Sequence, residues 1–275
     1  MNRNNTGVNV HGRFLWYELM TTDMEGAKAF YTDVVGWGMQ DASPDTRYVL
    51  FTAEGVPVSG LSALPPEAIQ AGFRPGWLGY VGVDDVDVSA ERMQELGGAI
   101  HVPPKEIPNV SRFAIGVDPQ MATIGVLKWL RPDELPDLEG PGRAGWHELL
   151  AADPATAWQF YRALFGWRKD AADVSAAGEY QLFSVGGVTM GGMFSKPDVV
   201  PVPFWLYYFN VADIDAVAKR VSAGGGKILT GPLEVPGSRW ILQCTDPQGA
   251  MFALLGKRSH TGVGYFERMP RSGKR

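Results

Sequence analysis

Two glutamates offer the most reactive chemistry in the sequence. Glu18 follows Trp16 by two residues, and Glu148 follows Trp146 at the same spacing. Because side chains two residues apart in a strand point to one face, each carboxylate is expected beside an indole ring. Apolar surroundings raise the pKa of a carboxylate, so the sequence predicts two candidate general bases, Glu18 and Glu148.

A structural role for the same glutamates is the competing interpretation. Each carboxylate would then pair with an arginine and hold strands together. The candidate partners are Arg13, Arg112, Arg143 and Arg239. Arg112 and Arg239 lie in similar contexts, Ser-Arg-Phe and Ser-Arg-Trp, and are also candidates for binding an anionic ligand. The plainer expectation for these two is a solvated arginine on an edge strand.

Composition and charge exclude several classes of partner. The chain of 275 residues has a formal net charge of −5, whereas a nucleic-acid groove needs a basic surface. No apolar run approaches the roughly 20 residues of a membrane helix, so we expect no membrane partner. The N-terminal residues do not resemble a secretory signal, and the single cysteine, Cys244, cannot form an internal disulfide. These features predict a cytoplasmic protein.

The chain is an internal duplication. Residues 12–40 align with 142–170, and residues 77–108 align with 205–236 without a gap. The identical pairs include Trp16/Trp146, Glu18/Glu148, Asp23/Asp153, Tyr31/Tyr161 and Trp37/Trp167. The repeat and the Pro/Gly/acid-rich stretch between its copies divide the chain as follows: a disordered tail over 1–11, a first domain over 12–130, a linker over 131–142, a second domain over 143–257, and a basic tail over 258–275.

The elements that must position the glutamates follow one order in both copies. In the first copy, residues 14–20 predict a strand, Asp23 predicts an N-cap, and the helix that follows is expected to end at Gly36. Further short strands follow, and a second round of the same order begins at Trp77. Each copy therefore contains two β-α-β-β-β units, and the chain is predicted to be an α+β protein with four of them.

These motifs resemble those of the vicinal oxygen chelate superfamily, which includes glyoxalase I, extradiol dioxygenases and the bleomycin- and fosfomycin-resistance proteins. The resemblance rests on Asp23, Phe30-Tyr31, Gly36-Trp37 and the Asp246-Pro247-Gln248-Gly249-Ala250 turn. It implies that the four units form two curled, mostly antiparallel sheets, each around one cavity. Because the superfamily hosts lyases, dioxygenases, transferases and non-catalytic binders, the fold alone does not choose a function.

The resemblance also implies a divalent metal in the cavity, held by His, Gln or Glu side chains at fixed strand positions. Here those positions carry Trp16, Gly60, Leu78 and Gly125 in the first copy, and Trp146, Gly192, Leu206 and Ala253 in the second. None of these side chains can ligate a metal. The histidines match neither across the repeat nor in spacing, and alternation turns His147 away from the face of Trp146. We therefore predict no metal and no other cofactor.

The residues left at these positions predict an aromatic and apolar pocket in each copy, with one carboxylate and one phenol. The candidate ligand-binding residues are Trp16, Leu78, Tyr80 and Arg112 in the first copy, and Trp146, Leu206, Tyr208 and Arg239 in the second. Tryptophan faces can stack on planar or cationic ligands. The expected partner is thus a small molecule.

Three functions stay open at this point. The first is a metal-free protein that binds a small apolar or aromatic molecule. The second is a metal-independent lyase, isomerase or hydrolase that uses Glu18 or Glu148 as a general base. The third is a metal-dependent glyoxalase or dioxygenase whose ligands lie elsewhere. All four units are on one chain, so either a monomer or a homodimer is expected.

Overall fold

The computed structural model describes residues 10–42, 48–130, 140–170, 173–175 and 178–259. Most of the two predicted tails and of the predicted linker lies outside these residues. In the described residues no helix has the length and apolar character that crossing a bilayer requires.

The first domain contains two β-α-β-β-β units, as predicted. The first unit consists of β1 (Phe14–Thr21), α1 (Met24–Val35), β2 (Gly38–Asp41), β3 (Val49–Ala53) and β4 (Val56–Ala63). The second consists of β5 (Gly76–Gly82), α3 (Val86–Glu95), β6 (Ala99–Ile107), β7 (Ser111–Val117) and β8 (Thr123–Trp129). A short helix, α2 (Pro66–Gln70), lies between the units, and the sequence patterns did not predict it.

The second domain repeats this order. Its first unit consists of β9 (Ala144–Ala151), α4 (Pro154–Phe165), β10 (Arg168–Lys169), β11 (Asp173–Ser175), β12 (Gly178–Val185) and β13 (Val188–Ser195). Its second consists of β14 (Phe204–Asp213), α5 (Ile214–Ala223), β15 (Lys227–Val235), β16 (Arg239–Thr245) and β17 (Met251–Lys257). The prediction of four units in an α+β chain is confirmed.

The helices begin and end where the sequence indicated. Asp23 caps α1 by accepting a hydrogen bond from the Gly26 amide at 2.9 Å, and Asp153 caps α4 in the same way. Gly36 ends α1 with a φ of +84°, a left-handed conformation that a side chain would disfavour. These local signals fix the point at which each helix returns the chain to the sheet.

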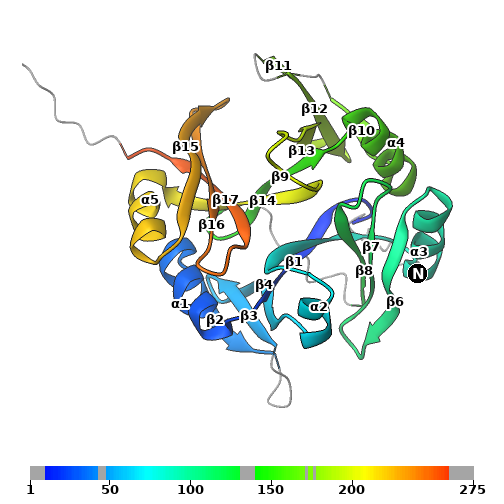
Figure 1. The fold of residues 1–275 in the computed structure, drawn as a ribbon, viewed down its shortest axis with the longest axis horizontal. Helices are drawn as coiled ribbons and strands as arrows, with labels where there is room; N and C mark the ends of the chain where they lie inside the picture. The colour runs from blue at the N-terminus through cyan, green and yellow to red at the C-terminus, as the bar shows by residue number, and fades with distance from the viewer. Residues whose placement is uncertain (1–9, 43–47, 131–139, 171–172, 176–177, 260–275) are drawn as a thin grey trace, which may run out of the picture.

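Each domain forms one curled sheet. The strand orders are β2-β3-β4-β1-β5-β8-β7-β6 and β10-β12-β13-β9-β14-β17-β16-β15. Within each unit the first strand pairs with the last in parallel, and the remaining pairs are antiparallel. Figure 1 shows β15–β17 and β12–β13 as opposite walls with β9 and β14 between them, so the second sheet forms a cup. The first sheet forms an equivalent cup on the opposite side of the molecule.

The convex faces of both sheets and the long helices share one hydrophobic core. Figure 1 shows α1 of the first domain beside α5 of the second, and α4 beside α3. Trp37 donates a hydrogen bond to the carbonyl oxygen of Gly142 at 2.7 Å, and Trp167 donates to that of Gly12 at 2.7 Å. Each domain therefore completes the core of the other, which places the remaining, concave faces toward solvent.

His147 lies in this shared core, on the face opposite Trp146, as alternation predicted. Its Nδ1 lies 2.7 Å from the Met190 carbonyl oxygen, which can only accept, so this nitrogen carries the proton. Its Nε2 then accepts a hydrogen bond from the Tyr17 hydroxyl at 2.6 Å. Burial lowers the pKa of His147 to about 4, so the ring is neutral at physiological pH. Its role is to join β1 to β9.

Candidate functional site

Glu18 of β1 is the centre of a polar network in the first cup. It accepts hydrogen bonds from the Ser62 hydroxyl at 2.7 Å and the Tyr80 hydroxyl at 3.1 Å. Tyr48 is its third hydrogen-bonding partner, and this hydroxyl accepts in turn from Trp16 Nε1 at 3.0 Å. The donors come from β4, β5 and the residue before β3, so the curl of the sheet brings them together.

Glu148 of β9 holds the same position in the second cup. It accepts hydrogen bonds from the hydroxyls of Tyr180 at 2.8 Å and Tyr208 at 2.5 Å. Tyr180 accepts from Trp146 Nε1 at 2.8 Å, and Tyr208 accepts from Gln243 Nε2 at 2.8 Å. Both carboxylates are thus the final acceptors of chains of hydrogen bonds that begin on indole or amide nitrogens.

Burial controls the protonation of both networks. It raises the pKa of Glu18 and of Glu148, and the hydroxyl donors counteract only part of that rise. Burial also raises the pKa of the tyrosine hydroxyls, with the neighbouring glutamate as a second cause for Tyr80 and Tyr208. The phenols therefore stay protonated donors, while the glutamates take up a proton more readily than exposed carboxylates.

Tyrosine rings cover the strand positions where the superfamily resemblance implies metal ligands. A Cβ at Gly60 would lie 1.9 Å from the Tyr48 hydroxyl oxygen, and a Cβ at Gly192 would lie 2.2 Å from Cε1 of Tyr180. At Gly125 the same atom would lie 2.2 Å from Cδ1 of Tyr80. A ligating side chain at any of these glycines would have to displace a ring.

The residues present therefore do not fit the metal site that the fold implies. Throughout the part of the chain that the structure describes, no three His, Cys, Asp or Glu side chains gather in a way that could hold an ion. The aromatic and carboxylate groups of each cup hydrogen-bond to one another instead.

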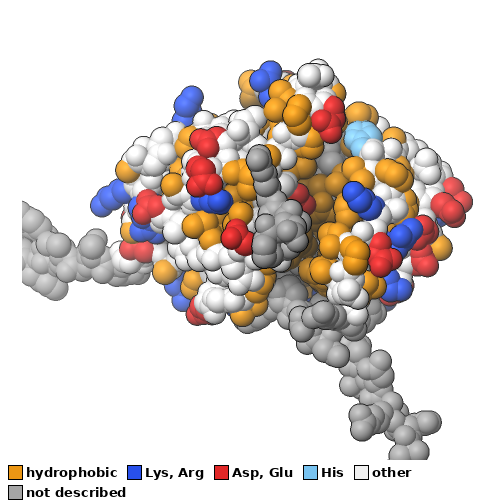
Figure 2. Space-filling model, turned by 90° about the horizontal axis from the view of Figure 1, so that it is seen from below, with side chains coloured by type: hydrophobic (Ala, Val, Ile, Leu, Met, Phe, Trp, Pro, Cys, Tyr) orange, Lys and Arg blue, Asp and Glu red, His pale blue; other side chains and the backbone are white. Residues whose placement is uncertain are grey.

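The structure brings together six of the eight predicted ligand-binding residues, three in each cup. Trp16, Leu78 and Tyr80 belong to one apolar cluster with Leu15, Leu127 and Trp129. Trp146, Leu206 and Tyr208 belong to its counterpart with Ala253 and Leu255. Seen from the side of the first domain, the molecule is hollowed at its centre, and hydrophobic side chains gather in the hollow (Figure 2).

The predicted pairing of the glutamates with arginines is wrong. Every group that hydrogen-bonds to Glu18 or Glu148 in the described part of the chain is a Tyr, Ser or Gln side chain. Arg143 instead lies 3.4 Å from Glu54, and Arg112 forms two hydrogen bonds of 2.7 Å to Asp87 on α3. Hydroxyl donors leave the glutamates without a counter-charge, which is why burial still raises their pKa.

Arg112 does not face the first cup, because strand register separates it from Arg239. Phe113 lies opposite Leu127, whereas Ile241 lies opposite the equivalent Leu255. Phe113 is therefore the counterpart of Ile241, and the similar tripeptides are offset by one residue. A one-residue offset reverses the face of a strand. Arg112 consequently points to α3, while Arg239 points into the second cup.

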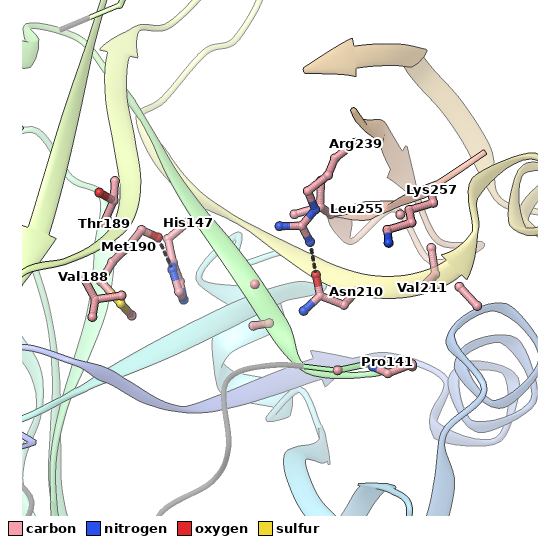
Figure 3. A pocket seen from close by; sticks show the side chains of 15 residues that line it. Pro141, His147, Val188, Thr189, Met190, Asn210, Val211, Arg239, Leu255 and Lys257 are labelled. Carbon is pink, nitrogen blue, oxygen red and sulfur yellow. Dashed lines mark hydrogen bonds between the residues drawn. The ribbon is translucent and has the colours of Figure 1, made fainter. Parts of the chain in front are cut away.

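Arg239 lies at one end of the second cup, beside a cavity of about 670 Å³. Its Nη2 donates a hydrogen bond of 2.7 Å to Oδ1 of Asn210 at the end of β14. Figure 3 shows these two side chains facing the opposite wall, where Val188, Thr189 and Met190 of β13 lie. Arg239 is on the same face of β16 as Gln243, which contacts Glu148. The cavity beside Arg239 extends to His147 and Met190, and the Glu148 network lies outside its lining.

Sequence patterns missed five polar residues of the two cups, which are Tyr48, Ser62, Tyr180, Asn210 and Gln243. A signal existed for two of them, because Tyr48 and Tyr180 are both twelve residues before a glycine, Gly60 or Gly192, in the two copies. The others have no counterpart of the same type, so only the folded sheet shows that Ser62 and Gln243 reach the glutamates and that Asn210 reaches Arg239.

Comparisons with known proteins agree with this architecture. A family model described as the Glyoxalase/Bleomycin resistance protein/Dioxygenase superfamily matches residues 13–126 and again 143–254. The chain is 32% identical over 243 residues to "Putative glyoxylase CFP32" of Mycobacterium tuberculosis, covering 87% of this chain and 93% of that protein. It is 27% identical over 259 residues to "Anthracycline biosynthesis protein DnrV" of Streptomyces peucetius, covering 88% and 92%.

Solved structures share the fold at low sequence identity. A Mn(II)-bound glyoxalase from Novosphingobium aromaticivorans superposes with a TM-score of 0.60 at 16% identity, over 91% of this chain and 83% of that one. The homoprotocatechuate 2,3-dioxygenase of Brevibacterium fuscum, in complex with 3,4-dihydroxyphenylacetate, gives 0.63 at 16% identity, over 94% and 85%. These likenesses extend to the fold and not to the chemistry of the site.

Proposed function

Because the chain belongs to the glyoxalase/bleomycin resistance protein/dioxygenase superfamily, we propose that it binds a small, largely apolar or aromatic molecule without a metal ion. The observation that carries this proposal is the network around Glu148, in which Tyr180 and Tyr208 donate to a buried carboxylate inside an aromatic cup. Mostly apolar walls with a few fixed polar groups are typical of a small-molecule site.

Two further observations support the proposal. Tyrosines lie across the glycines at the implied metal positions, so the cup presents rings and hydroxyls to a ligand. In addition, two relatives are named for the biosynthesis of anthracyclines, which are fused-ring aromatic compounds. Since one chain supplies all four units, the site needs no second copy, and a monomer or a homodimer would both accommodate it.

Energy transfer from tryptophan to a neutral aromatic dye tests the proposal. Phenyl-naphthylamine fluoresces in apolar surroundings, and we expect saturable transfer to it from the protein. Trp146→Phe should lower the transfer if the second cup holds the dye, and Trp16→Phe should lower it if the first cup does. A signal that never saturates, or that neither substitution changes, would contradict binding in the cups.

A general base is the second candidate function, and the raised pKa of both glutamates favours it. Each carboxylate oxygen has two lone pairs, so acceptance from hydroxyl donors still leaves room for a substrate proton. Glu18 or Glu148 would then remove a proton from a bound compound in a metal-independent reaction. Glu18→Gln combined with Glu148→Gln should abolish such turnover and preserve dye binding, whereas unchanged turnover would eliminate this candidate.

A further inference from the structure

The two cups differ at one end, where two equivalent positions carry a side chain and a glycine in opposite order. The first copy has Leu15 on β1 and Gly82 at the end of β5, whereas the second has Gly145 and Asn210 at the same places. A Cβ at Gly82 would lie 2.6 Å from Leu15 Cδ1, and a Cβ at Gly145 would lie 2.4 Å from Asn210 Oδ1. In the first cup the Leu15 side chain therefore occupies the space that the Asn210 amide occupies in the second cup.

The neighbouring strands also carry uncharged side chains in the first cup and basic side chains in the second. The register of the last strand pair makes Ser111 the counterpart of Arg239 and Trp129 the counterpart of Lys257. Trp129 packs edge-on against Trp16 with ring centroids 5.8 Å apart, which closes that end of the first cup with apolar groups. In the second cup the same positions carry two basic side chains, and both line the cavity of about 670 Å³.

Arg239 has no acidic partner among the described residues, in contrast to Arg112 and Arg258. Arg112 is paired with Asp87 at 2.7 Å, and Arg258 with Asp215 at 2.8 Å. Arg239 hydrogen-bonds only to the neutral amide of Asn210, and no Asp or Glu is among the residues that line the cavity. Partial burial disfavours its charge, as the lowered pKa of Arg239 reflects. An anion would compensate that cost.

The position of Arg239 relative to the Glu148 network sets the size of the ligand. Arg239 and Gln243 are four residues apart on one face of β16, a separation of about 13 Å along a strand. Gln243 contacts Tyr208 and Glu148, and Leu255 lies between the two ends. A compound of two or three rings spans this distance, and Ile241 and Leu255 lie along it.

We infer that the second cup, and not the first, is the ligand chamber, and that it takes an aromatic compound bearing a negatively charged oxygen group. This inference rests on the proposed function and specifies its ligand class. The anionic group lies at Arg239 and Lys257, and the rings extend along the cup toward Trp146 and Tyr208. The hydrogen bond from Arg239 to Asn210 holds the guanidinium in place before the ligand arrives.

A matched pair of dyes tests the inference on the full chain. Anilinonaphthalene sulfonate carries one negative group, and phenyl-naphthylamine has the same rings without it. We expect wild-type protein to bind both dyes at one site. Arg239→Met should weaken binding of the sulfonate by about ten-fold and change binding of the neutral dye by less than about two-fold. Arg112→Met, the same change in a similar tripeptide facing α3, is the control and should alter neither affinity.

A second variant locates the chamber. Gly145→Leu together with Asn210→Gly gives the second cup the pair that the first cup already accommodates, so the fold should tolerate it. We expect this double variant to weaken both dyes by at least about ten-fold. Leu15→Gly in the first cup should leave both affinities unchanged.

Each other outcome has a defined meaning. If both dyes bind and Arg239→Met weakens them equally or not at all, the anionic ligand class is wrong, while binding in the cup stands. If the exchange in the second cup changes neither affinity, the chamber assignment is wrong, and a loss of transfer with Trp16→Phe would then place binding in the first cup. Failure of wild-type protein to bind either dye would overturn the inference and the proposed function together.

Discussion

Tyr31 of the first domain donates a hydrogen bond to the buried carboxylate of Asp246 in the second, with the two oxygens 3.1 Å apart. The relationship is reciprocal, because Tyr161 donates to Asp118 at 3.0 Å. Each aspartate also accepts backbone N–H groups of the turn before the last strand of its domain. Each domain thus supplies a donor to the turn before the last strand of the other domain.

Removal of either tyrosine hydroxyl should destabilise the fold. Tyr31→Phe leaves Asp246 with one donor fewer in a buried place, and the expected loss in the free energy of unfolding is about 1–3 kcal/mol. Tyr161→Phe should cost a similar amount. Because the two contacts share no residue, the losses should add in the double variant. Urea unfolding measures all three, and an unchanged midpoint in both single variants would show that the cross-domain bonds carry no stability.

The stability of the protein should depend on the ionisation of Glu148. Burial raises its pKa in the folded state, so the folded protein binds a proton that the unfolded chain has already released. The stabilisation from this group is complete below the unfolded pKa and is lost as the pH rises through the folded pKa. The Glu148→Gln variant has no ionisable group at this position. Its free energy of unfolding should therefore increase relative to that of wild type as the pH rises through the folded-state pKa of Glu148.

Urea unfolding from acid to neutral pH measures this difference. A wild-type minus Glu148→Gln difference that does not change with pH would mean that the carboxylate does not change its protonation on folding.

The glycine beneath Tyr48 should not tolerate a side chain. Gly60→Ala places a Cβ 1.9 Å from the Tyr48 hydroxyl oxygen, and the ring must move, at an expected cost of about 1–3 kcal/mol in the free energy of unfolding. Gly76→Ala is the matched control, because its nearest contact is a backbone oxygen 3.9 Å away. Tyr48→Ala should remove most of the penalty of Gly60→Ala in the double variant, and strict additivity of the two changes would contradict a direct clash.

Purified protein should contain no stoichiometric divalent metal. The reason is chemical, since the positions that the fold would use carry Trp, Leu, Gly and Ala, which offer no ligand atoms. Elemental analysis after dialysis measures the content directly, and a chelator should leave the dye affinities unchanged. One equivalent of a transition metal per domain would restore the metal-dependent interpretation of the site.

Local signals in the sequence were sufficient for the architecture. Duplicated motifs, Asp caps such as Asp23 and a left-handed Gly36 identified the units, and alternation correctly placed Trp16, Glu18 and Tyr80 on one face. These features depend on the chain within a few residues of each position. Periodicity of two or 3.6 residues carries that information directly.

Only the tertiary structure decided which groups meet. Glu18 contacts Ser62 and Tyr80, 44 and 62 residues away, because a parallel and an antiparallel neighbour flank β1. The faces of Arg112 and Arg239 depend on a one-residue difference in strand register, which the similar tripeptides conceal. Sequence therefore determined the elements and their inward faces, while strand pairing, which joins distant segments through backbone hydrogen bonds, determined the partners of each carboxylate and the basic end of the second cup.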